Sequence, residues 1–121
     1  MSVRTVYRSA ESEGEQQESS WGALRWLASG SIGNAEGLTL GRVIIKAGDS
    51  NPRHCHKTCE EVLYLMSGTL VHTLGDAELT LEAGDTISIP AGVYHNGINH
   101  GSEDADMIVA YSSATRDFVL E

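Results

Sequence analysis

Short apolar segments separated by glycine-containing turns run through this sequence from residue 21 onward. Segment 37–47 is rich in β-branched residues, and several segments end in a Gly-Asp pair such as Gly48-Asp49, Gly75-Asp76 or Gly84-Asp85. No window holds a convincing apolar period of 3.6 residues, so the pattern predicts strands rather than amphipathic helices. The predicted strands cover residues 21–28, 37–47, 61–66, 69–74, 78–83, 86–89, 93–98 and 107–113. Together they predict an all-β sandwich or barrel.

The N-terminal part differs from the rest in composition. Residues 1–8 alternate enough to form an edge strand, whereas residues 9–20 carry four glutamates and no apolar residue beyond Ala10. We therefore predict an N-terminal edge strand with an acidic solvated loop over residues 1–20, followed by a β-barrel domain over residues 21–121. A chain of 121 residues is long enough for one domain with an ordinary hydrophobic core.

The charge balance excludes some classes of partner. Eight Lys and Arg stand against seventeen Asp and Glu, for a formal net charge of −9, and no basic run of five residues occurs. We therefore expect no nucleic-acid partner and no docking on anionic membranes. The sequence shows no signal-peptide pattern and no segment of transmembrane length, so a cytoplasmic location is the expectation.

The cysteines, Cys55 and Cys59, are expected to be free thiols because disulfides are rare in the cytosol. In a strand, Cys55 would point away from the face that carries its neighbours His54 and His56.

Three histidines and one glutamate have the spacing of metal ligands. His54 and His56 are one residue apart, so in a strand both imidazoles leave the same face. Glu61 starts the next apolar segment after a short turn, and His95 comes from a later strand. Such a site exists only once the barrel has folded. Imidazoles with one carboxylate suit divalent Fe, Ni, Cu or Zn, and Mn is tolerated because one ligand is oxygen.

Two stretches of the sequence resemble the two motifs of the cupin superfamily. The first, GDSNPRHCHKTCEEVLYLMSG over residues 48–68, holds Gly48, His54, His56, Glu61 and Gly68 at the motif spacing. The second, GDTISIPAGVYHNGIN over residues 84–99, holds Gly84, Pro90, Gly92, His95 and Asn99.

The resemblance implies a small single-domain cupin, that is, a double-stranded β-helix or jelly-roll barrel. It also implies one divalent transition metal held by His54, His56, Glu61 and His95, and spacing to Gly68 selects Glu61 over Glu60. Four protein ligands on a six-coordinate ion leave two positions for water, substrate or dioxygen. Glu61 is also a candidate base.

Further residues are candidates for the substrate pocket of such a barrel. They are Trp26, Arg42, Tyr94, His100, Tyr111 and Arg116. For the aromatic residues, core packing is the competing interpretation. Arg42 is either a solvated edge residue or an anchor for a carboxylate. Strand alternation sends Tyr64 and Met66 away from the metal.

The tail TRDFVLE resembles the endings of some small cupins that act on sugar acids. That resemblance would put Arg116 and Asp117 near the pocket mouth, and the alternative is a surface ion pair. His100 falls near the predicted barrel mouth, but His72 and His100 belong to neither motif, and a structural or solvated role is the favoured interpretation for both.

The ligand set favours a metalloenzyme acting on a small polar organic molecule. Its chemistry would be dioxygen-dependent oxidation, or isomerase or lyase chemistry on a sugar or organic acid. The alternative is a non-catalytic cupin that binds or senses a small ligand. A homodimer is expected because jelly rolls leave sheet edges, and residues 1–8 are a candidate for the added strand.

Overall fold

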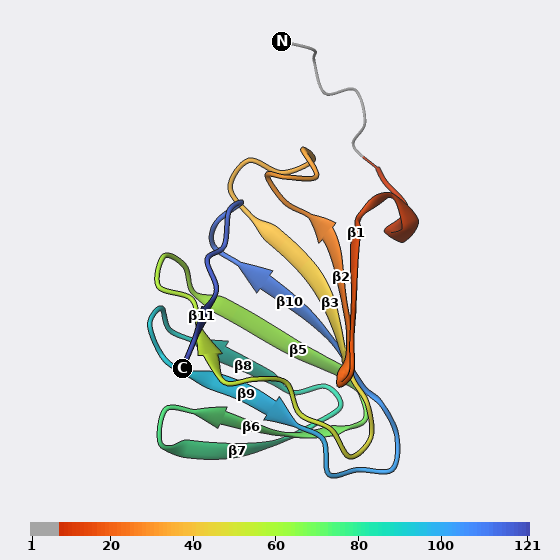
Figure 1. The fold of residues 1–121 in the computed structure, drawn as a ribbon, viewed down its shortest axis with the longest axis vertical. Coiled ribbons are helices and arrows are strands. Elements are labelled where there is room, and N and C mark those ends of the chain that lie inside the picture. The colour runs from red at the N-terminus through yellow and green to blue at the C-terminus, as the bar shows by residue number, and fades with distance from the viewer. Residues whose placement is uncertain (1–7) are drawn as a thin grey trace.

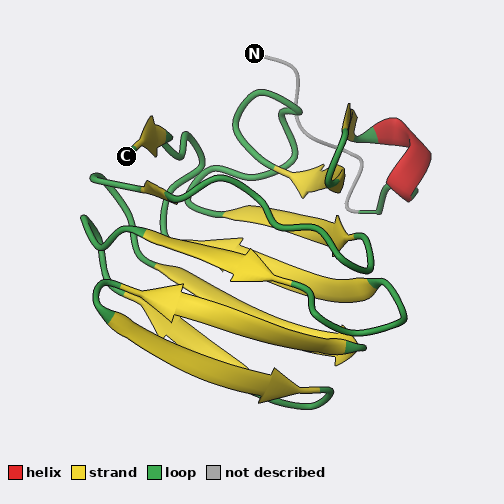
Figure 2. Ribbon diagram, turned by 60° about the horizontal axis from the view of Figure 1, so that its bottom comes forward, coloured by secondary structure: helices red, strands yellow, loops and turns green. Residues whose placement is uncertain are grey.

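The computed structural model describes residues 8–121, in which eleven strands form two antiparallel sheets (Figures 1 and 2). The spatial order in the six-stranded sheet is β1 (Glu15–Ser19), β2 (Gly22–Ala28), β3 (Thr39–Ile45), β10 (Ala105–Tyr111), β5 (Glu61–Ser67) and β8 (Thr86–Ile89). In the five-stranded sheet it is β11 (Val119–Leu120), β4 (His54–Cys55), β9 (His95–Ile98), β6 (Thr69–Leu74) and β7 (Ala77–Glu82). The predicted all-β jelly roll is confirmed. No helix among these residues is long and apolar enough to cross a membrane.

The core lies between the two sheets and is built by simple alternation along the strands. In β5, Leu63 and Leu65 are buried, while Tyr64 and Met66 are exposed on the outer face as predicted. The side chain of Leu65 is fully buried. Burying a leucine of this kind stabilises the fold by about 1.5–3 kcal/mol. Glu61, the first residue of β5, is buried on the same inner face as Leu63 and Leu65. The strand that contributes to the core therefore also carries a predicted metal ligand.

One turn shows why the Gly-Asp pairs are effective strand breaks. Leu74 pairs with Ala77, so a two-residue loop, Gly75-Asp76, joins β6 to β7. Gly75 has φ of 60°, whereas Asp76 keeps a negative φ, which is the pattern of a type II′ hairpin turn. The glycine is therefore required at the first position, because residues with a Cβ are strained there.

The acidic segment is the part of the fold that our prediction missed. Residues 9–20 were expected to be a loop, but they contain a short 3₁₀ helix (Glu11–Glu13) and β1, which pairs along its length with β2. Arg25 and Arg42 face each other across β2 and β3, and each attracts a glutamate, Glu18 at 2.5 Å and Glu11 at 3.2 Å. The acidic strand is therefore held by backbone pairing and by the Glu18–Arg25 ion pair rather than by apolar burial, and the Glu11–Arg42 pair holds the 3₁₀ helix. The edge strand predicted for residues 1–8 lies almost wholly outside the described residues.

Both cysteines are buried and free, as expected from the sequence.

Candidate metal centre

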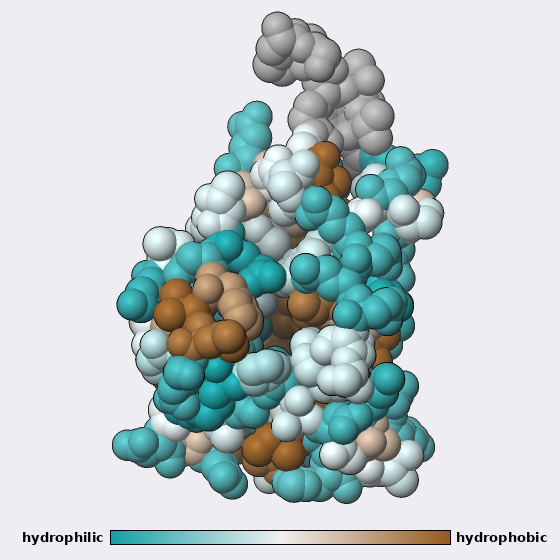
Figure 3. All heavy atoms as spheres, in the orientation of Figure 1, coloured by the Kyte–Doolittle hydropathy of each residue, from teal (hydrophilic) through white to brown (hydrophobic). Residues whose placement is uncertain are grey.

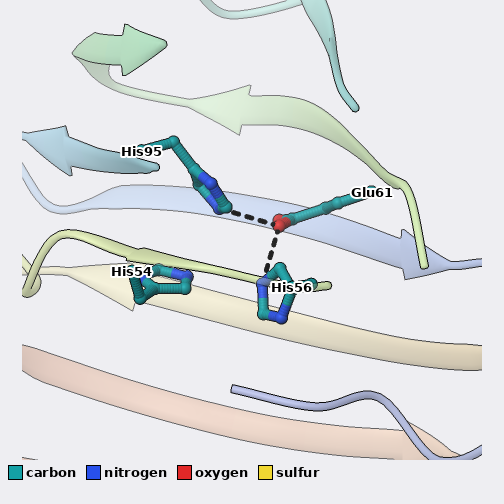
Figure 4. Close-up of side chains that lie close together, drawn as sticks. All are labelled: His54, His56, Glu61 and His95. Carbon is teal, nitrogen blue, oxygen red and sulfur yellow. Dashed lines mark hydrogen bonds and ion pairs between the residues drawn. The ribbon is translucent and has the colours of Figure 1, made fainter. Parts of the chain in front are cut away.

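The structure brings together the four side chains that the sequence predicts as metal ligands (Figure 4). His54 begins β4 and His56 follows it, while Glu61 begins β5 and His95 begins β9. One donor atom from each lies within 4.8 Å of the others, and all four residues are buried. Strands from both sheets therefore contribute to one site inside the barrel.

Each of the three imidazoles is oriented by a backbone carbonyl. A carbonyl oxygen only accepts hydrogen bonds, so the Nδ1 atom that faces it carries the proton, and the lone pair of Nε2 is free for a metal. The bonds run from Nδ1 of His54 to the oxygen of Pro52 at 2.7 Å, from His56 to Asp117 at 2.5 Å, and from His95 to Val93 at 2.9 Å. The protein thus sets the same tautomer at all three rings.

The separations between donor atoms fit one ion. Oε1 of Glu61 lies 3.1 Å from Nε2 of His95 and 3.3 Å from Nε2 of His56. Ligands bound at roughly 2.1 Å and at right angles to one another lie about 3.0 Å apart. The Nε2 atom of His56 is buried and has no hydrogen-bond partner in the described chain. Buried nitrogen atoms without a hydrogen-bond partner are rare in proteins. A metal ion bound at this nitrogen would satisfy it.

The electrostatics of the cluster also suit a cation. Burial lowers the pKa of His54 to about 4, which keeps this imidazole neutral and able to bind metal. Burial alone would raise the pKa of Glu61, but the imidazoles of His56 and His95 beside its carboxylate outweigh this effect and lower that pKa to about 2. Neutral imidazoles and one carboxylate together suit a divalent first-row transition metal, with two further positions of an octahedral ion free for ligands.

A cavity of about 160 Å³ lies beside this cluster. His54, Glu61 and His95 form part of its wall, and most of the rest is apolar. Figure 3 shows a hollow with apolar residues inside it near the middle of the face that it displays. Three of the predicted pocket residues line the cavity, namely Trp26, Tyr111 and Arg116.

Arg116 is the cationic residue of this cavity. Its guanidinium lies 4.1 Å from the centre of the Trp26 ring and 5.4 Å from that of Tyr111, so aromatic faces support its charge. Among the described residues, no carboxylate pairs with it. In particular, Asp117 does not form the surface ion pair that was one interpretation of the tail, because its carboxylate binds Thr58 instead.

The wall beneath Arg116 depends on a glycine. A Cβ at Gly41 would lie 2.6 Å from the Trp26 ring, so the ring occupies the space that a side chain would take.

Burial raises the pKa of Tyr111 well above its usual value, and the negative charge of Glu61 adds to this effect. Tyr111 therefore stays a neutral phenol.

The remaining predicted pocket residues do not line the cavity. Arg42 lies on β3, between β2 and β10 rather than at an edge, and its guanidinium makes two hydrogen bonds to Asp106 on the outer face. Tyr94 precedes the inward-pointing His95 and is only half-buried, and His100 follows the end of β9 and is exposed. The carboxylate-anchor interpretation of Arg42 is therefore wrong for this cavity, because strand alternation turns its side chain outward.

Sequence reasoning also missed residues that the structure places at the site. His72 is buried in β6, lines the cavity and stacks on His95 with ring centroids 5.6 Å apart. Phe118 stacks on His54 with centroids 4.7 Å apart and ring planes at 26°. The signal for His72 was present in its even spacing from the buried Leu70, whereas Phe118 lies in a tail without strand periodicity.

Fold and site together define the class of this protein as a β jelly roll with a site of three histidines and one glutamate suited to a metal. The cupin domain model matches residues 41–111, more than half of the sequence, and the chain belongs to this family.

Similar proteins include enzymes named for oxalate. Oxalate oxidase GF-2.8 of Triticum aestivum is 33% identical over 95 residues, covering 72% of this chain and 42% of the relative. Germin-like protein subfamily 2 member 1 of Arabidopsis thaliana is 34% identical over 85 residues, covering 66% and 39%. The chain thus spans less than half the length of these curated relatives.

Solved structures of enzymes named for oxalate are also similar to this chain. Oxalate oxidase in complex with the substrate analogue glycolate has a TM-score of 0.76 and 25% identity, covering 83% of this chain and 55% of that one. Oxalate decarboxylase of Bacillus subtilis at pH 4.6 has a TM-score of 0.83 at 21% identity, covering 91% of this chain and 30% of that one. The second likeness supports the fold.

Proposed function

We propose that this chain is a metal-dependent enzyme that acts on a small organic acid. The observation that carries this proposal is a cavity with a metal-suited cluster on its wall and a cationic Arg116 without a carboxylate partner among the described residues. A guanidinium binds a carboxylate through parallel charge-assisted hydrogen bonds. A substrate with one anionic group toward the metal and another toward Arg116 uses both features.

The volume of the cavity limits the size of the reacting group. An apolar cavity of about 150 Å³ holds a molecule of benzene size, roughly six non-hydrogen atoms. At about 160 Å³, the present cavity takes a fragment of that size. A short dicarboxylate such as oxalate, which gives several of the relatives their names, is of this size and charge.

The residues of the chain have distinct tasks in this proposal. A bound metal would polarise the substrate oxygen and offer the positions at which substrate or dioxygen binds. Arg116 neutralises and orients the carboxylate, while the apolar wall excludes water from it. Tyr111, as a neutral phenol, donates a hydrogen bond. Glu61 is ionised at neutral pH, so its carboxylate would hold the metal together with the three histidines and would be the base for a substrate proton.

Two reactions fit this arrangement and are separated by their products. Oxidation converts oxalic acid and dioxygen to two molecules of carbon dioxide and one of hydrogen peroxide. Non-oxidative decarboxylation converts hydrogen oxalate to formate and carbon dioxide and needs no net oxidant. Oxygen uptake, peroxide and formate are therefore measured with oxalate, glycolate and a panel of sugar acids, using protein reloaded separately with Mn, Fe, Ni, Zn or Cu.

Variants show whether the site is responsible. His95→Ala removes a ligand and is expected to abolish turnover, whereas His100→Ala changes an exposed histidine outside the cavity and is expected to retain it. If a panel compound stabilises the protein but no product forms, the chain is a non-catalytic binding module and not an enzyme. Absence of both turnover and stabilisation with every metal would reject the proposal.

We also propose a cytoplasmic location, which the two buried free thiols support. Fractionation of cells that express the natural protein tests it. The homodimer stays a prediction, and light scattering at two protein concentrations tests it.

A further inference from the structure

We propose that Asp117 is a positioning residue for the metal site, and that residues 117–121, named here the clamp segment, hold the strand that carries His54 and His56. This inference needs the metal site described above but no particular substrate or reaction.

Asp117 contacts a predicted ligand directly. Its backbone oxygen accepts the hydrogen bond from Nδ1 of His56 at 2.5 Å. The tautomer and direction of the His56 ring therefore depend on where the backbone of a residue 61 positions away is placed. By contrast, the carbonyls that orient His54 and His95 come from residues two positions earlier in the same segment. His56 is thus the ligand whose orientation relies on a distant part of the chain.

The side chain of Asp117 fixes that carbonyl in place. Its carboxylate accepts hydrogen bonds from the backbone N–H of Lys57 at 2.7 Å, the backbone N–H of Thr58 at 3.0 Å and the Thr58 hydroxyl at 2.6 Å. Hydrogen bonds to a carboxylate are charge-assisted and stronger than neutral ones. The turn after His56 and the carbonyl that orients its ring are therefore joined through one residue.

The rest of the clamp segment holds the other ligand of the pair. Phe118 stacks on the ring of His54, and Val119 and Leu120 of β11 pair with Cys55 and His54 of β4. Figure 1 shows β11 lying against β4.

This support matters because β4 has little other pairing. The ladder between β4 and β9 consists of one register pair. An isolated pair of this kind gives weak orientation to a two-residue strand. With the clamp segment in place, both edges of β4 are paired, and the segment contacts the ring of each imidazole.

The alternative is that the clamp segment only closes the barrel and contributes general stability. The two roles differ in what they change. General stability lowers the melting temperature and leaves the His56 tautomer and the metal affinity of the folded protein unaltered. Positioning changes the tautomer and the affinity even at a temperature at which the variant is fully folded.

The test compares Asp117→Ala with wild type in the full chain. Zn²⁺ affinity is measured by competition with a chelating dye, and the His56 tautomer of the metal-free protein by ¹⁵N NMR of the imidazole. We expect affinity to fall by about 10- to 100-fold, as for other groups that orient ligands, and the Nδ1–H signal of His56 to weaken. Asp106→Ala is the matched control, because it removes a carboxylate that binds Arg42 on the outer face.

Affinity within twofold of wild type, or an equal loss in Asp106→Ala, would overturn the proposal. Thr58→Val is the milder variant if Asp117→Ala does not fold, since it removes a single donor, and we expect a loss of a few-fold. An unaltered Zn²⁺ affinity in that variant, with the wild-type His56 tautomer, counts against positioning. The experiment measures metal binding and not turnover. The positioning proposal can therefore fail while the proposed function holds, and the reverse.

Discussion

His54 and His95 face each other across the single register pair that joins β4 to β9. Their ring centroids are 4.4 Å apart, although the residues lie in different motifs of the sequence. One backbone pairing therefore brings the two halves of the ligand set together, and the geometry of the metal centre is a direct consequence of sheet register.

Replacing His95 by alanine is expected to remove most of the bound metal while the barrel stays folded. The ligand set loses one of its four donors, whereas the strand pairing of β9 does not involve the imidazole. Elemental analysis of protein purified without added metal, together with circular dichroism, checks this. Wild-type metal stoichiometry in a folded His95→Ala variant would show that the ligand assignment is wrong.

Chelation of the metal is expected to lower the melting temperature reversibly. An ion that binds only the folded state stabilises it by about 2.7 kcal/mol at 100 times Kd, which for a domain of this size is a rise on the order of 10 °C. Differential scanning calorimetry with and without added metal measures the shift. The His95→Ala variant serves as the control and should show little or no metal-dependent rise.

Removing the guanidinium of Arg116 is expected to weaken substrate binding. A hydrogen bond to a charged group is worth about 1.5–3 kcal/mol, so KM for an anionic substrate should rise roughly 10- to 100-fold in Arg116→Ala. Arg42→Ala is the matched control, because its guanidinium is engaged with Asp106 outside the cavity. Steady-state kinetics decide the question, and equal effects of the two variants would exclude a specific role for Arg116.

Acidification is expected to destabilise the metal-free protein partly through His72. Burial lowers the pKa of His72 to about 4 in the folded state, below the ordinary value of 6.5. The unfolded chain therefore binds more protons between these values, and the free energy of unfolding falls as the pH drops from about 6.5 to 4. His72→Leu removes this contribution, which is on the order of 3 kcal/mol. Urea denaturation at pH 7 and pH 4 measures it, and identical pH dependence of the two proteins would contradict the assignment.

The sequence predicts most of the fold because its inward residues alternate and its turns are marked. In β5, the alternation of Leu63 and Leu65 with Tyr64 and Met66 suffices to assign the faces of the strand. The ligands were predictable for a related reason. Their spacing reflects a fixed relationship between strand ends, and it resembles the spacing of the cupin motifs.

The parts that could not be predicted depend on partners far away in the sequence. β1 has no apolar face, and the partners of Glu18 on β1 and of Glu11 in the 3₁₀ helix are Arg25 on β2 and Arg42 on β3. The role of Phe118 depends in the same way on where β11 lies against β4. Arg42, by contrast, was open to a better prediction, because its neighbours Gly41 and Val43 are inward and strand alternation turns it outward.

The place of β11 beside β4 also has a consequence for the making of the protein. Synthesis runs from the N-terminus, so a nascent chain exposes all four ligands before the residues that orient His56 have emerged. The mature geometry of the metal centre is then reached only after translation has passed residue 120. Orientation of His56 by the backbone oxygen of Asp117 therefore cannot precede synthesis of that residue.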